Sequence, residues 1–329
     1  MKSSSIAESV YRVNLKYVEL QNKTKELFFK CLEANKDIDY FNKELEKLWG
    51  EVDHSFLQDE INSYIEAIHE QNKALLGVEE IPEGEDFKEY LKLTSIAVIM
   101  GAEASFVKKK KIEYNNSSRS YFYKTNKEEY LKMKVQKYTD QVVPYYSQET
   151  GKKVRDVELS TYCSMIHNTN LTRTTWNTTL NDAVAMEQTK FYIPYHSFSC
   201  PYCVAHQNKV LTMKQVMNLI GHIGEQEGDI LHPNCKCILT FYNWRSKFHK
   251  SGYSKAELEE QYNIRQKTNS LTLKKEKIKT DMKIQKSLGN QDEVDELNKQ
   301  RNRINKEIRD LKEALPTTEL KKQVVVINR

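Results

Sequence analysis

Apolar residues recur every three or four positions along most of the chain, a spacing that places them on one face of an α-helix. Between residues 5 and 76 this spacing is carried by Phe41, Leu45, Leu48, Trp49, Leu57, Ile61, Tyr64, Ile65 and Ile68. Gly77 is a typical helix end, and the segment 78–86 has the Pro, Gly and acidic residues of a linker. The pattern predicts a long helical region in the first part of the chain.

A second helical stretch is predicted from Phe87 onwards. The four lysines at 108–111 could bind phosphate, but we interpret them as a solvated helix end, where cations also complement the helix dipole. Residues 115–118 read Asn-Asn-Ser-Ser and predict a loop. The segment 119–147 is rich in Tyr and Lys, and we predict helix there up to Val143-Pro144.

One more helix is predicted from residue 154 to about residue 189, although its many Thr and Asn residues have low helix propensity. Within it, Cys163 lies beside Met165 and Ile166, and we interpret it as a small buried apolar residue. His167 is interpreted as a residue of the surface or of a helix end.

The pattern changes at residue 190. Aromatic and β-branched residues predict strands at 191–199, 209–212 and 236–242, with a short helix at 213–220. This small mixed module, residues 190–243, buries little apolar area, and modules of that size often need a staple.

After Tyr253 the helical spacing returns and continues to Pro316, with one break at Leu288-Gly289-Asn290. The second arm carries an apolar seam interrupted once, at Val294, Leu297, Arg301, Ile304, Ile308, Leu311 and Leu315. The first arm has a similar spacing at Ile264, Leu271, Ile278 and Met282. We predict a coiled-coil-like antiparallel hairpin that turns at Gly289. A helix of another chain could replace one arm, so self-association through the hairpin is also predicted.

Candidate chemistry is concentrated in the cysteines, four of which are Cys200, Cys203, Cys235 and Cys237. They form the pattern C-x-x-C, a gap that can carry a helix, and C-x-C. Four thiolates in two tightly spaced pairs can complete a tetrahedral shell around Zn²⁺, so we predict a structural zinc ion. His232, three residues before Cys235, is an alternative ligand in place of Cys237.

The tetrapeptide Cys200-Pro201-Tyr202-Cys203 is also similar to the active site of glutaredoxins. A glutaredoxin would place it near the start of a βαβ domain and add a Thr-Val-Pro turn and a Gly-Gly pair, which this sequence lacks. No Walker loop, G-x-G-x-x-G, H-E-x-x-H or G-x-S-x-G occurs either. A thiol–disulfide oxidoreductase is therefore the weakest alternative, and we expect no enzymatic activity.

The net charge of +5 is too small for binding of nucleic acid by the whole surface, so any contact would need a local patch. Residues 265–286 hold eight basic and two acidic side chains, a net of +6. The candidate DNA contacts there are Lys274, Lys275, Lys277, Lys279 and Lys283. A zinc-stabilised DNA-binding protein is the alternative function, although we favour a solubilising face of the hairpin.

With 10 glycines and 6 prolines in 329 residues, the composition also favours helix. We predict a mainly α protein with long N-terminal helices, a small α+β zinc-binding module and a C-terminal antiparallel helical hairpin. The predicted regions are an N-terminal helical region at 1–150, a core with the cysteine module at 151–250, and the hairpin and tail at 251–329. No signal peptide and no run of ~20 apolar residues is visible, so synthesis in a cytoplasm and no membrane partner are expected.

The order C-x-x-C, then His206-Gln-Asn-Lys-Val210, then His232-Pro-Asn-Cys-Lys-Cys237 resembles the minor head proteins of tailed phages. These are the Mu F-like head-morphogenesis proteins and the phage minor capsid protein 2 family. Gln207-Asn208 stands where the family often has Gly, and Lys236 replaces the usual Arg. The similarity extends over about residues 155–315, whereas the first 150 residues match only in being helical.

The resemblance implies a structural virion protein, present in few copies, that is made in the cytoplasm of the host bacterium. The expected partners are the portal and other phage head proteins, and the expected place is the interior of the head near the portal. Such proteins assist head assembly and can leave with the packaged DNA. Some relatives carry a catalytic toxin domain at the C-terminus, for example an ADP-ribosyltransferase, and we expect none here because the chain continues as a helical hairpin.

Overall fold

The computed structural model describes residues 3–82, 87–146, 152–196, 201–221, 235–242, 248–249, 255–314 and 325–326. The helices are α1 (Ser3–Glu33), α2 (Ile38–Gly50), α3 (Ser55–Leu76), α4 (Phe87–Arg119), α5 (Tyr121–Thr125), α6 (Lys127–Lys137), α7 (Leu159–Ala185), α8 (Pro201–Val204), α9 (Met213–Gly221), α10 (Lys255–Ser287) and α11 (Gln291–Ala314). The strands are β1 (Gln141–Tyr146), β2 (Lys153–Glu158), β3 (Lys190–Tyr192), β4 (Val210–Thr212), β5 (Thr240–Phe241), β6 (Phe248–His249) and β7 (Val325–Val326). The predicted fold class is confirmed: the protein is mainly α, with small sheets and a C-terminal helical pair.

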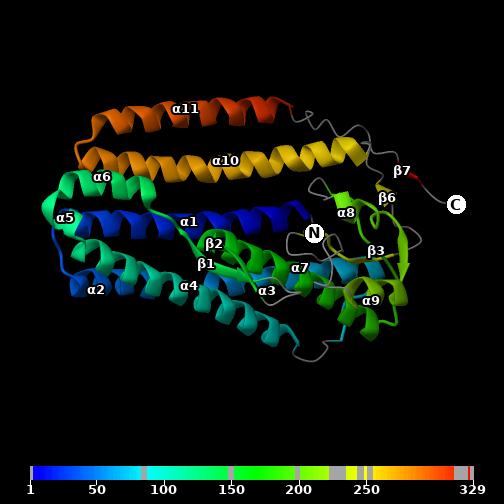
Figure 1. Cartoon of the computed structure of the whole chain (residues 1–329). Coiled ribbons are helices and arrows are strands. Elements are labelled where there is room, and N and C mark those ends of the chain that lie inside the picture. The colour runs from blue at the N-terminus through cyan, green and yellow to red at the C-terminus, as the bar shows by residue number, and fades with distance from the viewer. Residues whose placement is uncertain are drawn as a thin grey trace.

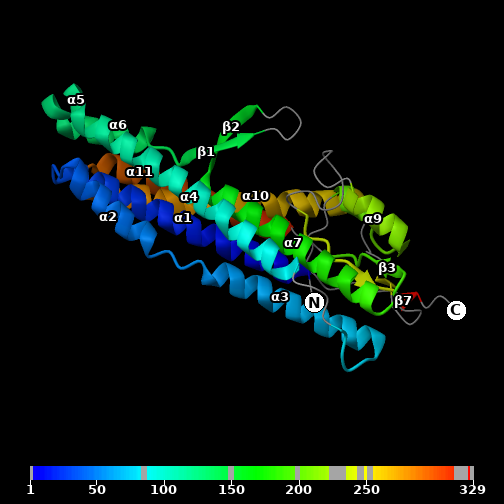
Figure 2. The ribbon, with the colours of Figure 1, turned by 90° about the horizontal axis from the view of Figure 1, so that it is seen from below.

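Helix α7 is the central element and contacts α1, α3 and α4 (Figures 1 and 2). The long helices run side by side along one direction. Helix α10 packs against α1, and α11 lies on the outer side of α10 (Figure 1). The cysteine module, with β3, α8, β4, α9 and β5, lies at one end of this arrangement. We call α1 to α7, together with β1 and β2, the helical body.

Buried aromatic rings fill the core of the helical body. Phe28 presents ring edges to Phe41 and Tyr114, with ring centroids 5.8 and 5.5 Å apart, and Phe41 stacks on Tyr114 at 4.0 Å. All three side chains are fully buried. Edge and offset contacts of this kind add to the free energy already gained by removing large rings from water.

The predicted helical stretch 5–76 divides into α1, α2 and α3. Asn35, at a φ of 51°, ends α1, and the carboxylate of Asp37 accepts the backbone N–H of Tyr40 to cap α2. Gly77 ends α3 as predicted: its φ of 71° is the left-handed conformation that glycine tolerates best, and its N–H donates to the carbonyl of Lys73.

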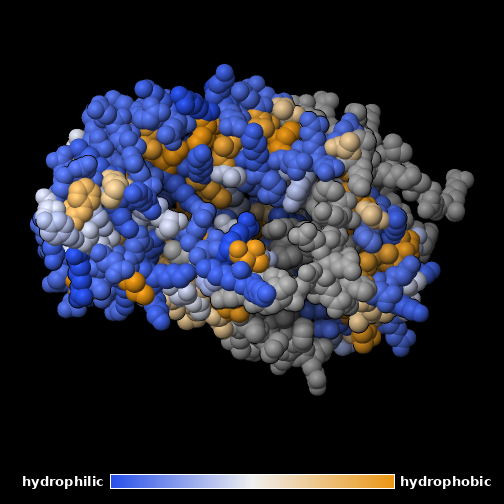
Figure 3. Space-filling model, viewed as in Figure 1, coloured by the Kyte–Doolittle hydropathy of each residue, from blue (hydrophilic) through white to orange (hydrophobic). Residues whose placement is uncertain are grey.

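The C-terminal hairpin is confirmed, with its turn at Gly289, whose φ is 70°. Ile278 of α10 and Leu297 and Ile304 of α11 form the buried seam between the two helices. Figure 3 shows hydrophobic residues gathered along this line on an otherwise hydrophilic face. Against α1, the hairpin makes ion pairs, Lys25 with Asp281 among them.

Three predictions for the middle of the chain were wrong. Residues 115–118 belong to α4 rather than to a loop, because Ser117 and the neighbouring Tyr114 are buried against other helices. Helix does not continue to Pro144, since α6 ends at Lys137 and β1 pairs with β2 in an antiparallel hairpin. Proline is tolerated in β1 because every strand of a two-stranded sheet is an edge strand. The first residues of the helix predicted from 154 are the strand β2.

The lysine run 108–111 was also misinterpreted, because it lies inside α4 and Lys110 is fully buried. The Lys110 ammonium donates to the backbone carbonyl of Thr139 and pairs with Glu113 at 3.1 Å and Asp140 at 3.7 Å. Burial lowers the pKa of Lys110 and raises that of Asp140. A charge at this depth is tolerated because opposite charges and a carbonyl replace the lost water.

His167 does not lie at the surface or at a helix end, as predicted, but in the middle of α7 with its ring buried. Its Nε2 lies 2.8 Å from the Ser9 hydroxyl of α1. Burial is the main cause that lowers the His167 pKa from 6.5 to about 4, so the ring is neutral near pH 7. Cys163, one turn earlier, is buried in the hydrophobic core cluster of the helical body, as predicted.

Candidate metal centre

A three-stranded antiparallel sheet, in the order β4-β3-β5, organises the cysteine module. In the strand register Phe191 of β3 is opposite Leu211 of β4 and Phe241 of β5. These side chains are buried in one apolar cluster with Trp176 of α7. Because β3 pairs with both β4 and β5, it brings the segments that precede and follow residues 213–239 next to each other.

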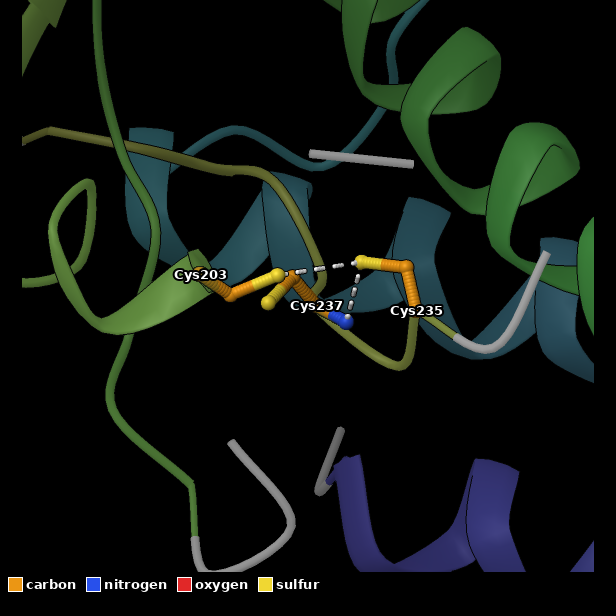
Figure 4. Close-up of side chains that lie close together, drawn as sticks. All are labelled: Cys203, Cys235 and Cys237. Carbon is orange, nitrogen blue, oxygen red and sulfur yellow. Dashed lines mark hydrogen bonds between the residues drawn. The ribbon is translucent and has the colours of Figure 1, made fainter. Parts of the chain in front are cut away.

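Three cysteine sulfur atoms meet in this module (Figure 4). Cys203 comes from α8, and Cys235 and Cys237 come from the extended segment that leads into β5. The three Sγ atoms all lie within 4.8 Å of one another, and those of Cys203 and Cys235 are 3.7 Å apart. Each of the three residues is 1% exposed. Residues more than thirty positions apart thus supply one closed sulfur cluster.

The spacing of the sulfurs fits a metal ion bound by thiolates. Zinc–sulfur bonds of ~2.3 Å at tetrahedral angles put neighbouring sulfurs ~3.8 Å apart. The 3.7 Å between the Cys203 and Cys235 sulfurs agrees with that value and is far beyond a disulfide bond of ~2.05 Å. The three cysteines are accordingly free thiols that could hold a metal ion.

The predicted ligand set is brought together as far as the structure describes it. Cys203, Cys235 and Cys237 form the cluster, so Cys237, one of the two alternatives for the last position, lies at the site. Cys200 and His232 lie outside the described residues.

Two further side chains reach the sulfur of Cys237, and sequence reasoning missed both. His196 follows β3 and places Nε2 3.4 Å from Cys237 Sγ, and Gln207 donates from Nε2 to the same sulfur at 3.4 Å. Burial lowers the pKa of His196 to about 4, so its ring is neutral near pH 7. Nothing in the spacing pattern marks Gln207, while His196 stands four residues before the C-x-x-C motif and could have been weighed as a candidate.

Side chains of helix α7 donate hydrogen bonds to the backbone of residues 235–239, which we call the cysteine segment. Asn168 and Thr172 both donate to the carbonyl of Cys235, at 3.0 and 2.8 Å. The indole of Trp176 donates to the carbonyl of Cys237 at 2.8 Å, and Thr179 donates to that of Leu239 at 3.1 Å. The donors recur every three or four residues on one helix face, and the acceptors alternate along the extended segment. The Thr and Asn content that weakens α7 as a helix is what binds this segment to it.

The candidate DNA-contacting lysines of α10 are partly engaged by acids. Lys277 pairs with Glu158, Lys279 with Glu276, and Lys283 with Glu26. Lys274 is exposed and Lys275 half-buried. Three of the five charges are therefore offset within the molecule, and DNA contact by this arm stays a prediction.

Comparison with known proteins gives no relative: no family model, curated protein or solved structure matches this chain. In the parts of the chain that the structure describes, no helix has both the length and the apolar character needed to cross a membrane.

Proposed function

We propose that this chain is a structural, non-enzymatic minor head protein of a tailed bacteriophage, whose cysteine module is held by a structural zinc ion. One observation carries the proposal: Cys203 meets Cys235 and Cys237 in one buried cluster. The described cysteines of the two motifs on which the family resemblance rests, C-x-x-C and H-P-N-C-K-C, thus lie at a single site.

The burial of the sulfurs supports a structural role for the ion rather than a catalytic one. Structural zinc sites are closed by protein ligands, whereas catalytic sites keep a position open to water or substrate. The sulfurs of Cys203 and Cys235 lie 3.7 Å apart and share one buried cluster with that of Cys237, which is the spacing of ligands around a single metal ion. These features favour a metal staple over thiol–disulfide exchange.

The place of the protein, inside the head and near the portal, is proposed from the resemblance. The side-by-side long helices and the hairpin that covers α1 give an extended surface on which portal and other head proteins could assemble (Figure 2). The alternative of a DNA-binding protein gains less support, because acids engage Lys277, Lys279 and Lys283. Release with the packaged DNA is part of the same proposal.

Metal analysis of the full chain, purified without chelators, tests the staple. We expect about one zinc ion per chain in the wild type and little in Cys235→Ala. The matched control is Cys31→Ala, because Cys31 is equally buried but lies in the core of the helical body. A wild-type protein that contains no metal and binds none would overturn the zinc proposal.

The head assignment needs a separate experiment. Mass spectrometry of purified particles of the phage that encodes this chain should find it in few copies relative to the major capsid protein. Its absence from mature heads and from assembly intermediates would contradict the assignment while leaving the metal site untouched. A salt-dependent mobility shift with DNA that Lys274→Glu weakens would favour the DNA-binding alternative instead.

A further inference from the structure

We infer that His196 and Gln207 act as paired hydrogen-bond donors to the Cys237 sulfur, stabilising its thiolate form and orienting it toward the metal without binding the ion themselves. This inference rests on the metal centre proposed above. It assigns positioning roles to two residues outside the Cys and His motif.

The geometry places both donors on one sulfur from separate parts of the chain. His196 Nε2 and Gln207 Nε2 each lie 3.4 Å from Cys237 Sγ. His196 follows β3, whereas Gln207 lies in the turn between α8 and β4. Their exposed fractions are 8% and 5%, so both contacts are shielded from water. The sulfur of Cys235 accepts a different donor, the backbone N–H of Cys237 at 3.4 Å.

Such donors have a clear purpose around a thiolate cluster. Several thiolates on one divalent ion leave a net negative charge, and a buried charge is costly where water cannot reach it. N–H groups aimed at the sulfur offset part of that charge and fix the direction of its lone pairs. Loss of partners of this kind typically weakens metal binding by about 10- to 100-fold.

His196 is a donor rather than a ligand. A tetrahedral ligand lies within about 4 Å of every other ligand atom. Among the described residues, the set of ligand atoms that all lie within 4.8 Å of one another holds the three sulfurs and not the His196 ring. The ring therefore lies at the edge of the cluster, with Nε2 3.4 Å from the Cys237 sulfur.

The test uses the full chain loaded with Co²⁺, which reports thiolate ligation through a sulfur-to-metal charge-transfer band. Chelator competition gives the Kd. The variants are His196→Phe and Gln207→Met, which keep size but remove the N–H donor. Each should weaken metal binding about 10- to 100-fold and move the charge-transfer band to lower energy, because a less stabilised thiolate gives up its electron more easily. His196→Gln, which restores an N–H at the position of Nε2, should recover both properties.

The outcomes separate this inference from the proposal on which it rests. A wild-type protein that binds no Co²⁺ would overturn both. Normal binding with an unchanged Kd and band in His196→Phe and Gln207→Met would overturn the donor roles alone. Failure of His196→Gln to rescue, with a changed ligand-field spectrum, would show His196 to be a ligand. The two donors lie on different segments, so if one variant fails to fold the other decides.

Discussion

The helical body and the cysteine module reach stability by different means. In the body, Phe28, Phe41 and Tyr114 pack ring against ring with no exposure. The module has a small apolar cluster, and its main links are between polar or sulfur atoms: the three sulfurs and the donors of α7. A region that buries many rings needs no staple, while a small one gains order from a neighbouring helix and, as proposed above, from a metal ion.

Helix α7 belongs to both regions and shows where the change occurs. In its first half Leu159 and Cys163 are part of the core of the body. In its second half Thr172, Trp176 and Thr179 hold the cysteine segment by hydrogen bonds. The module is therefore attached to the body through individual hydrogen bonds. Each of these bonds can be removed by a single substitution.

Removal of the proposed metal ion should have the largest effect, and that effect should be confined to the cysteine module. Metal binding to small thiolate sites is worth on the order of 10 kcal/mol, so a chelator should open the module. Hydrogen exchange should speed up in residues 201–221 and 235–242 while α1, α2 and α4 stay protected. Equal loss of protection in both regions would show that the two are one cooperative unit.

The second prediction concerns the aromatic core of the helical body. Phe28→Ala removes a fully buried ring from the aromatic core and should lower the free energy of unfolding by about 3–5 kcal/mol. Urea unfolding followed by circular dichroism measures the loss. The metal content of the folded protein should not change. Tyr121→Ala is the control, because Tyr121 is 83% exposed and its loss should cost less than about 0.5 kcal/mol.

The third prediction concerns pH and the joint between α1 and α7. His167 has its pKa lowered by burial from 6.5 to about 4. Between these pH values the unfolded chain binds a proton that the folded chain does not. Stability therefore falls as the pH is lowered from about 6.5 to 4, by roughly 3 kcal/mol for this group.

His167→Gln should remove that part of the pH dependence while keeping a polar partner for Ser9. The measurement is the free energy of unfolding of both proteins at several pH values between 4.5 and 7. Other groups, His196 among them, titrate alike in both proteins, so the difference between the two slopes isolates His167. Parallel slopes would contradict the assigned cause.

The smallest predicted effect tests one hydrogen bond between α7 and the cysteine segment. Thr172→Val removes one donor to the Cys235 carbonyl and should cost about 1 kcal/mol, seen as faster local exchange in the cysteine segment. Thr178→Val is the matched control, because Thr178 is similarly buried in α7 and its hydroxyl donates to the carbonyl of Thr174 within the same helix. If both variants behave alike, the contact across to the segment contributes nothing of its own.

The sequence predicted the elements whose pattern is local. The apolar seam of α10 and α11 and the turn at Gly289 follow from spacing and from one residue type. Residues 115–118 were predicted wrongly because Asn and Ser favour loops only when no tertiary contact decides, and here Tyr114 and Ser117 are buried. Lys110 looked solvated since its partners Thr139 and Asp140 are thirty residues away.

At the candidate site, the spacing of the cysteines in the sequence was enough to predict that Cys203 lies close to Cys235 and Cys237. It could not reveal Gln207, because a single amide between strands has no periodic or motif signal. The same limit applies to Thr172 and Trp176, whose acceptors are backbone carbonyls about sixty residues later. A carbonyl carries no mark in a sequence, so such contacts become visible only in three dimensions.

The ion pair of Lys25 with Asp281, where the hairpin meets α1, has a consequence for synthesis on the ribosome. The two residues are 256 positions apart. At a translation rate of about 5–20 residues per second, Asp281 is synthesised roughly 10 to 50 s after Lys25. During that interval the side of α1 that α10 later covers stays accessible in the nascent chain to a chaperone or to a neighbouring chain.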